Sequence, residues 1–267
     1  MTNYIFVFDG IGASDGRTSN VIDQAAYRLR DSLAEHNMDF VVEWVDWPAS
    51  MAGIGPYPWP ESTRMGIRNF DRRLGKMKPD DKFVILAFSG GNRPAREWLE
   101  NIAVDDPAML DRVLAVGLAS DPYRPVGKQQ TGMPVPGGYG VCGERETPIM
   151  DRTFWLAIPG DVITDAAHNS MLRTLADFSD DFPGDMLRGL TRVVHHNDFQ
   201  LAWKLKVFRE NPLHWFMGLG PRLHQAKNDI VGYMSGTHTL AYTRPFEDGD
   251  SAMVRFANTI SWKVRNP

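Results

Sequence analysis

Strand-like stretches alternate with helix-like stretches along most of the chain, and this alternation limits the possible folds more than any other feature. Helical periodicity is found, for example, at Val21–Glu35 and Ser62–Lys76. Runs of β-branched and aromatic residues predict strands at Tyr4–Phe8, Phe40–Trp47, Phe83–Phe88, Val113–Gly117 and Thr153–Ile158. Because parallel strands need long crossover connections, the order predicts an α/β architecture with a mostly parallel central sheet and helices on both faces.

Two segments interrupt this alternation. Residues 118–152 contain five prolines and several glycines, and such a long connection is typical of a functional loop. Residues 168–232 show helical patterns with no strand among them. We therefore expect one domain over residues 1–267, with a helical insertion or cap at 168–232 inside it.

Charge and cysteine content exclude several classes of partner. The net charge is −4 and lysines and arginines form no run, so nucleic acid is not an expected partner. The single cysteine, Cys142, excludes an internal disulfide framework and suits a reducing cytosol. No apolar stretch reaches the ~18–20 residues of a membrane span, and MTNYIFVFDG has no basic leader. We expect a protein made soluble inside the cell, while its oligomeric state stays open.

The stretch VILAFSGGNRPA, residues 84–95, carries a strand directly into Ser89 and then into helix-forming residues. A nucleophilic serine on a strand-to-helix turn needs small residues two positions before and after it, because larger side chains would strike the neighbouring strand and helix. Ala87 and Gly91 occupy these positions. The pentapeptide alone leaves two interpretations open, a nucleophile and a serine that only caps a helix.

The order of residues further along the chain favours the nucleophile. Asp161 follows the predicted strand TFWLAI in the turn PGDVITD, and His238 lies in the small-residue loop SGTHTLAY. Serine, then acid, then histidine, each after a strand, is the order of an α/β-hydrolase triad. In such a site the first backbone N–H groups of the new helix stabilise an oxyanion, and Gly90 would supply one of them.

The loop FDGIGASDGRTS admits a second interpretation. Gly10, Gly12 and Gly16 follow a strand and precede a helix, as in a dinucleotide-binding loop, but their spacing is one residue too long and the P-loop lysine is missing. The loop fits better as the source of a second oxyanion donor, the Ile11 amide.

Other residues that could carry chemistry are better explained as structure. His195, His196 and Asp198 do not share one helical face, and EDGDS at 247–251 is too short for a calcium loop. For Cys142 the sequence names no adjacent base that would activate the thiol. The sequence therefore predicts neither a metal site nor an organic cofactor.

The segments AFSGG, PGDVIT and YMSGTHTLAY resemble the lysin B esterases of phages that infect mycolic-acid-bearing bacteria, relatives of the cutinases. The resemblance implies an α/β-hydrolase fold and a serine esterase that cleaves the ester between mycolic acids and arabinogalactan. It implies that Ser89, Asp161 and His238 form the catalytic triad, with mycolyl-arabinogalactan of the host envelope as substrate after release at lysis. Ala87 and Gly90 depart from the usual glycine and glutamine of that family.

Two other functions stay open at this point. One is a general cutinase-like carboxylesterase or lipase with no specificity for the cell envelope. The other is a binding protein that keeps the fold but has no activity.

Overall fold

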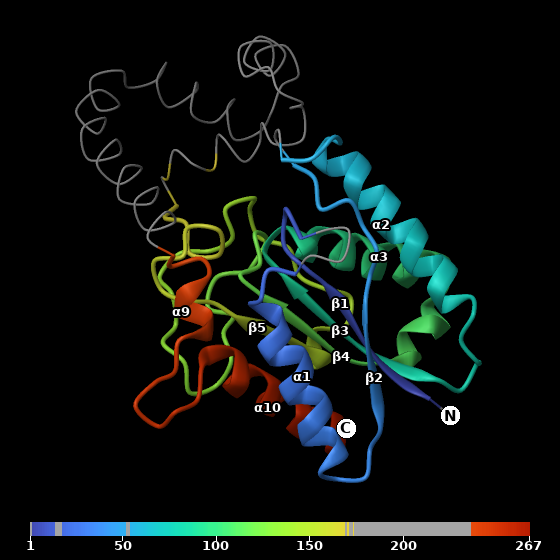
Figure 1. Cartoon of the computed structure of the whole chain (residues 1–267). Coiled ribbons are helices and arrows are strands. Elements are labelled where there is room, and N and C mark those ends of the chain that lie inside the picture. Colours follow the sequence, from blue (N-terminus) through green and yellow to red (C-terminus); the bar gives the residue numbers. More distant parts are fainter. Residues whose placement is uncertain (1, 14–17, 52–53, 169, 171–172, 174–235) are drawn as a thin grey trace, which may run out of the picture.

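The computed structural model describes residues 2–13, 18–51, 54–168, 170, 173 and 236–267 (Figure 1). Their strands form one five-stranded sheet in the order β2-β1-β3-β4-β5, and every neighbouring pair is parallel. The strands are β1 (Asn3–Phe8), β2 (Phe40–Trp44), β3 (Lys82–Phe88), β4 (Val113–Ala119) and β5 (Thr153–Leu156). The prediction of an α/β architecture with a parallel sheet is confirmed.

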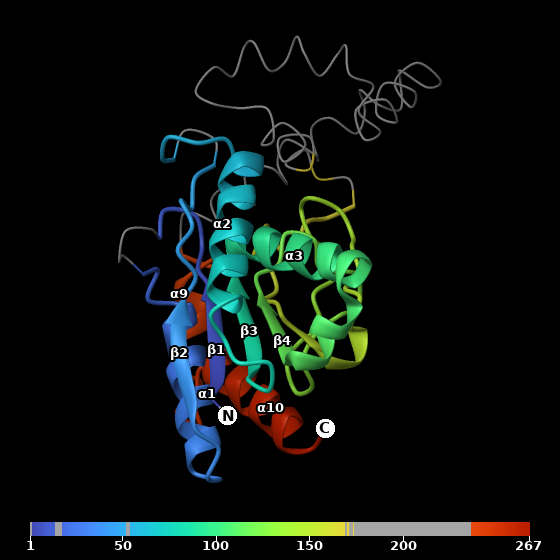
Figure 2. The same ribbon diagram turned by 90° about the vertical axis from the view of Figure 1, so that its right-hand side faces the viewer.

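Helices cover both faces of the sheet, as the strand–helix alternation predicts. Figures 1 and 2 show α1 (Ile22–Ala34) and α10 (Ala252–Arg265) together on one face, and α2 (Trp59–Leu74) and α3 (Asn92–Asp105) on the other. The one-turn helix α9 (Leu240–Thr243) follows directly after the His238 loop.

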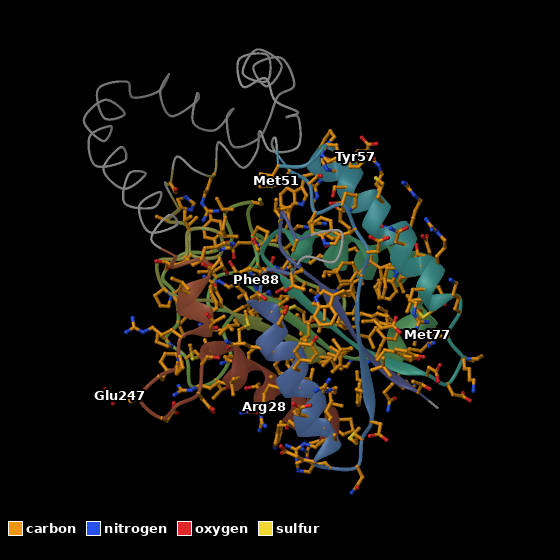
Figure 3. All side chains as sticks on the ribbon, in the orientation of Figure 1. Arg28, Met51, Tyr57, Met77, Phe88 and Glu247 are labelled. Atoms are coloured by element: carbon orange, nitrogen blue, oxygen red, sulfur yellow. The ribbon has the colours of Figure 1, made fainter. Side chains whose placement is uncertain are left out.

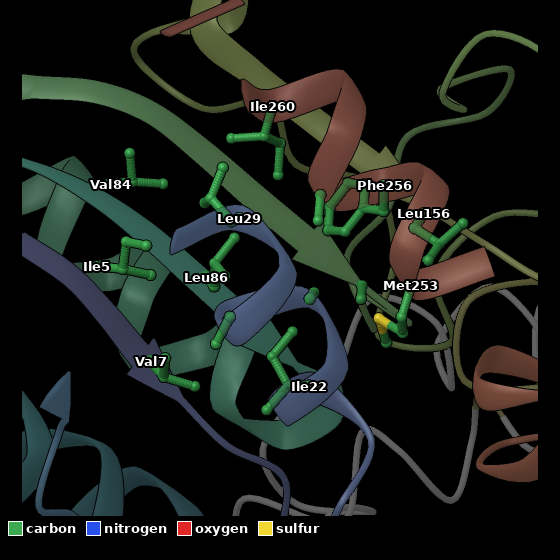
Figure 4. Close-up of a cluster of buried hydrophobic side chains, with 14 of the residues drawn as sticks. Ile5, Val7, Ile22, Leu29, Val84, Leu86, Leu156, Met253, Phe256 and Ile260 are labelled. Atoms are coloured by element: carbon green, nitrogen blue, oxygen red, sulfur yellow. The ribbon is translucent and has the colours of Figure 1, made fainter. Parts of the chain in front are cut away.

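The core has two layers because successive side chains of a strand point to opposite faces. On β3, Val84 and Leu86 pack toward α1 and α10, with Ile22, Phe256 and Ile260 around them (Figure 4). The alternate residues of β3 pack toward α2 and α3 in a second cluster that contains Phe83, Ile85, Phe70 and Trp98. A strand buried on both faces must be apolar throughout, which explains the continuous apolar run that leads into Ser89.

Most elements begin or end one or two residues from the predicted positions, and two boundaries differ by three residues. The strand β2 ends at Trp44 rather than Trp47, because Trp47 turns away into a separate buried cluster with Trp59 and Tyr123. The helix α2 begins at Trp59 rather than Ser62. Pro58, the residue before the helix, has an extended backbone. Pro60 lies in the first turn, where a backbone N–H has no acceptor within the helix, so the proline costs no hydrogen bond.

Buried arginines hold the long connection after β4. The Arg124 and Arg173 side chains are almost fully buried, and both guanidinium groups donate to backbone carbonyls. Burial lowers the pKa of Arg124. The carbonyls that they bind belong to Pro125, Lys128, Gly138, Tyr139, Gly140, Val141, Thr164, Ala166 and Ala167. These arginines therefore supply side-chain donors to carbonyls of a connection that lies outside the sheet and the helices.

The predicted helical insertion at 168–232 lies outside the described residues except for positions 168, 170 and 173, and it stays a prediction, as does the single domain over 1–267. Within the described part of the chain, no helix has the length and apolar character that crossing a membrane requires.

Candidate active site

The chain turns sharply at Ser89, directly after β3. Its φ is +52°, in the left-handed region that non-glycine residues rarely adopt. A 3₁₀ turn at Ser89–Gly91 follows and continues into α3. Figure 3, in which Phe88 is labelled, shows that this corner lies at the end of the central strands. A serine held in a strained strand-to-helix turn exposes its hydroxyl at the edge of the sheet.

The residue two positions after Ser89, Gly91, is small because the backbone at the end of β1 lies against it. A Cβ on Gly91 would stand 2.3 Å from the carbonyl oxygen of Asp9 and 2.4 Å from that of Phe8. Ala87 is fully buried in β3, where its neighbours are Phe8 and Leu118 on the flanking strands. The glycine of the small-x-Ser-x-small pattern thus has a packing cause in this fold.

Ser89, His238 and Asp161 form one continuous hydrogen-bonded chain. Ser89 Oγ lies 2.8 Å from His238 Nε2, and His238 Nδ1 lies 3.0 Å from Asp161 Oδ1. Because a carboxylate only accepts, Nδ1 carries the proton and Nε2 is left to accept from the serine hydroxyl. Ser89 follows β3 and Asp161 follows β5, so the shared carboxyl edge of the parallel sheet brings these side chains together.

Asp161 is the most enclosed member of this group. Besides His238, its carboxylate accepts from Ser120 Oγ at 2.5 Å, from the Tyr242 hydroxyl at 2.6 Å and from the Ile163 amide at 3.2 Å. Burial pushes the pKa of Asp161 upward, but the attraction of His238 and the hydrogen bonds outweigh it, so the pKa lies below its ordinary value. The carboxylate is therefore kept ionised in a site without solvent access.

Three residues of this network do not stand out in the sequence. Ser120 follows β4, Tyr242 lies on α9, and the Asn92 amide donates to the carbonyls of Ser89 at 2.8 Å and Ala119 at 2.9 Å. Burial and the charge of Asp161 raise the pKa of Tyr242 well above its usual range, so this hydroxyl stays a donor. Tyr242 lies four residues after His238, a spacing that puts two side chains on one face of a helix. For Ser120 and Asn92 the sequence holds no comparable signal.

The Phe88 ring also restrains the His238 imidazole, by aromatic packing. The Phe88 ring stacks on His238 with centroids 5.2 Å apart and meets Tyr242 edge-on at 5.8 Å. His238 is 6% exposed, so its ring is held on several sides while Nε2 faces the serine.

The two residues predicted to supply the oxyanion donors, Gly90 and Ile11, are in contact through the Ile11 side chain. Gly90 is the second residue of a 3₁₀ turn, where an amide has no intrahelical partner. A Cβ at Gly90 would stand only 2.4 Å from Ile11 Cγ1, so the Ile11 side chain lies directly over that glycine. Asp9 anchors this loop by accepting from the Gly10 amide and from both the amide and the hydroxyl of Ser19. Burial raises the pKa of Asp9 despite these hydrogen bonds.

Among the described residues, Cys142 and the EDGDS turn do not belong to this hydrogen-bonded network. Cys142 is partly buried against two small apolar clusters, and Asp248 in EDGDS accepts from Arg255 and from the Asp250 amide, as an acidic turn does. The described residues hold no group of three or more His, Cys, Asp or Glu side chains arranged for a metal. His195, His196 and Asp198 lie outside the described residues, as does Gly16.

Comparison with solved structures identifies the architecture. Lysin B from Mycobacteriophage D29 superposes with a TM-score of 0.51 at 16% identity, covering 63% of this chain and 69% of that protein. The chain has an α/β-hydrolase fold. A cutinase-like protein from Cryptococcus sp. matches with a TM-score of 0.49 at 14% identity, covering 65% of this chain and 85% of that one. No protein-family model and no curated protein sequence matches the chain.

In an α/β-hydrolase the carboxyl edge of the sheet is where a nucleophile, a base and an acid converge from separate loops. Ser89, His238 and Asp161 converge at that edge here, and Gly90, one of the two predicted oxyanion donors, directly follows the serine. Such an arrangement is suited to acyl transfer through a covalent serine intermediate.

Proposed function

We propose that this chain is a serine carboxylic-ester hydrolase in which Ser89 is the nucleophile, His238 the general base and Asp161 the acid that orients the histidine. The observation that carries the proposal is the continuous hydrogen-bonded chain from Ser89 Oγ through His238 to a buried, ionised Asp161. The strained serine corner and the α/β-hydrolase fold support it.

Each residue has a defined step in this mechanism. His238 Nε2 takes the hydroxyl proton of Ser89 while Oγ bonds to the ester carbonyl carbon, and Asp161 stabilises the imidazolium that forms. The oxyanion accepts from the amides of Gly90 and Ile11. Collapse breaks the ester C–O bond, and His238 gives its proton to the departing alcohol. Water, deprotonated by the same imidazole, then hydrolyses the acyl-enzyme and regenerates Ser89. The mechanism uses no metal and no organic cofactor.

We further propose that the ester is the one joining mycolic acids to arabinogalactan, so that the chain acts on the host envelope after release at phage lysis. Two observations support this substrate: the likeness of the AFSGG, PGDVIT and YMSGTHTLAY segments to lysin B esterases, and the superposition on lysin B from Mycobacteriophage D29. In this proposal the helical insertion at 168–232 belongs to the same domain and shapes the acyl site.

The nucleophile is tested by labelling with a fluorophosphonate, followed by mass spectrometry of the modified peptide and by kinetics on a short soluble ester. Ser89→Ala is expected to lose labelling and roughly 10³-fold or more of kcat, with its melting temperature retained. Ser32→Ala is the matched control, because that buried hydroxyl pairs with Ser261 between α1 and α10, away from the carboxyl edge of the sheet. Normal turnover by Ser89→Ala would refute the assignment, and an unreactive wild type would favour a binding protein.

The substrate is tested separately on purified mycolyl-arabinogalactan. Mass spectrometry is expected to detect free mycolic acids released by the wild type and none by Ser89→Ala. Hydrolysis of short esters without release of mycolic acids would leave the esterase intact and point to a general cutinase-like carboxylesterase.

A further inference from the structure

The three-residue mechanism assigns no role to Ser120, yet its hydroxyl contacts two of the three residues. Ser120 Oγ donates to Asp161 Oδ2 at 2.5 Å and lies 3.2 Å from His238 Nδ1. The side chain is fully buried at the end of β4, next along the sheet from β3. His238 therefore has a serine hydroxyl at each ring nitrogen, Ser89 at Nε2 and Ser120 at Nδ1.

The backbone at Ser120 makes the choice of serine informative. Its φ is +47°, in the left-handed region, which glycine adopts freely and in which the backbone of any other residue is strained. A requirement of the backbone alone would be met better by glycine. What serine adds over glycine is the hydroxymethyl group, and that hydroxyl bonds to Asp161 and His238. An observed strain at a buried polar position points to a function of the side chain.

The Ser120 corner is also fixed to the Ser89 corner. The Ser120 amide donates to the carbonyl of Leu156 in β5 at 2.9 Å. The carbonyl just before it, that of Ala119, accepts from the same Asn92 side-chain amide that binds the Ser89 carbonyl. One asparagine thus holds the two strained serine corners at a constant separation.

We propose that Ser120 is a positioning residue that locks Asp161 and His238 into the arrangement that Ser89 needs, and that Asn92 couples this lock to the nucleophile corner. The inference rests on the proposed esterase function. Ser120 and Tyr242 together occupy Oδ2 of the carboxylate, so only Oδ1 faces the imidazole and the carboxylate cannot rotate away. When His238 takes the serine proton, its Nδ1–H points between two fixed oxygens, Asp161 Oδ1 and Ser120 Oγ.

Two substitutions separate the hydroxyl from the backbone strain. Ser120→Ala removes the hydroxyl and keeps the strain, whereas Ser120→Gly removes both and should therefore melt at a higher temperature than Ser120→Ala. Both are expected to lower kcat on a short ester roughly tenfold with KM unchanged, the loss expected when one hydrogen bond to a charged group no longer orders the site. Asn37→Gly is the matched control for strain relief, since Asn37 has φ +58° in an exposed turn. It should raise stability without changing kcat.

A second readout does not depend on turnover. The proton shared by His238 Nδ1 and Asp161 gives a resonance far downfield in a one-dimensional proton NMR spectrum, and its assignment is checked by its loss in His238→Ala. In Ser120→Gly this resonance is expected to shift and to broaden by faster exchange with water, because the carboxylate is less constrained. In Asn37→Gly it should stay in place.

These measurements distinguish failure of the inference from failure of the esterase proposal. If Ser120→Gly keeps kcat within about twofold of wild type with an unmoved resonance, the positioning role is wrong even though Ser89 reacts with the phosphonate. If Ser120→Ala loses both kcat and melting temperature while Ser120→Gly keeps its kcat, the residue matters only for the backbone conformation at position 120. The inference is then again overturned. If wild-type Ser89 does not react at all, the esterase proposal fails, and the resonance still reports whether Ser120 orders the His238–Asp161 pair.

Discussion

Replacement of Asp161 by asparagine tests the electrostatic core of the site with the smallest change of shape. The carboxylate accepts from His238, Ser120, Tyr242 and the Ile163 amide, two donors on each oxygen. The substituted side chain would present one oxygen and one NH₂ group to the same donors. With the NH₂ toward His238, the imidazole must carry its proton on Nε2 and cannot accept from Ser89. With the NH₂ toward the hydroxyls, the tautomer survives but the imidazolium has no negative partner.

The magnitude follows from these contacts. Loss of the correct tautomer or of the counter-charge is expected to lower kcat by roughly 10³–10⁴-fold, with little change in KM. The variant also replaces a charge-assisted hydrogen bond with a mismatched pair at a fully buried position. Such a bond contributes about 1.5–3 kcal/mol to the free energy of unfolding. For a chain of this size that predicts a fall in Tm of roughly 3–12 °C at neutral pH.

The loss of stability has a definite pH dependence. Because the folded-state pKa of Asp161 lies below its ordinary value of 3.8, ionised Asp161 contributes its full stabilisation above that pH and loses it as pH falls through the folded-state pKa. The difference in Tm between wild type and Asp161→Asn should therefore be largest near neutral pH and shrink under acid conditions. Differential scanning calorimetry across pH measures this difference, and initial rates on one soluble ester measure kcat. A gap in Tm that widens on acidification, or a kcat within about tenfold of wild type, would contradict the reasoning.

Two further substitutions test the packing around Ser89. Gly91→Ala places a Cβ against the backbone carbonyls of Phe8 and Asp9, which can move only if β1 moves. The free energy of unfolding is expected to fall by about 1–3 kcal/mol, with a lower Tm measured by circular dichroism. An unchanged Tm would show that the corner is less tightly packed than described. The new methyl group of Gly90→Ala meets only the Ile11 side chain, so the variant should lower kcat by displacing the loop that carries Ile11. Ile11→Ala in the same chain should restore part of the lost kcat. Additive effects of the two substitutions in a double-mutant cycle would count against a contact between residues 90 and 11.

The sheet and its two helical layers are predictable because their cause is local and repetitive. A strand such as Phe83–Phe88, apolar at every position, must be buried on both faces, and that requirement can be read from the residues alone. The meeting of Ser89 with Asp161 and His238 is predictable for a related reason, since parallel strands end at the same edge of the sheet.

Features that depend on contacts between distant segments are not predictable in this way. Trp47 continues the strand pattern of its neighbours, but its partners Trp59 and Tyr123 draw it out of the sheet. Ser120 looks like any polar residue after a strand, because its positive φ and its two hydrogen bonds arise only when β4 and β5 lie side by side. Asn92 is likewise informative only once its two carbonyl partners are known.

The arginines that hold the connection after β4 also impose an order of events during synthesis. The Gly140 carbonyl is bound by Arg173, which the ribosome adds 33 residues later. At ~5–20 residues per second, Arg173 is added roughly two to seven seconds after Gly140. Ser120 and Asp161 lie on either side of that carbonyl along the chain. We therefore expect the acid side of the site to assemble only after residue 173 has been made.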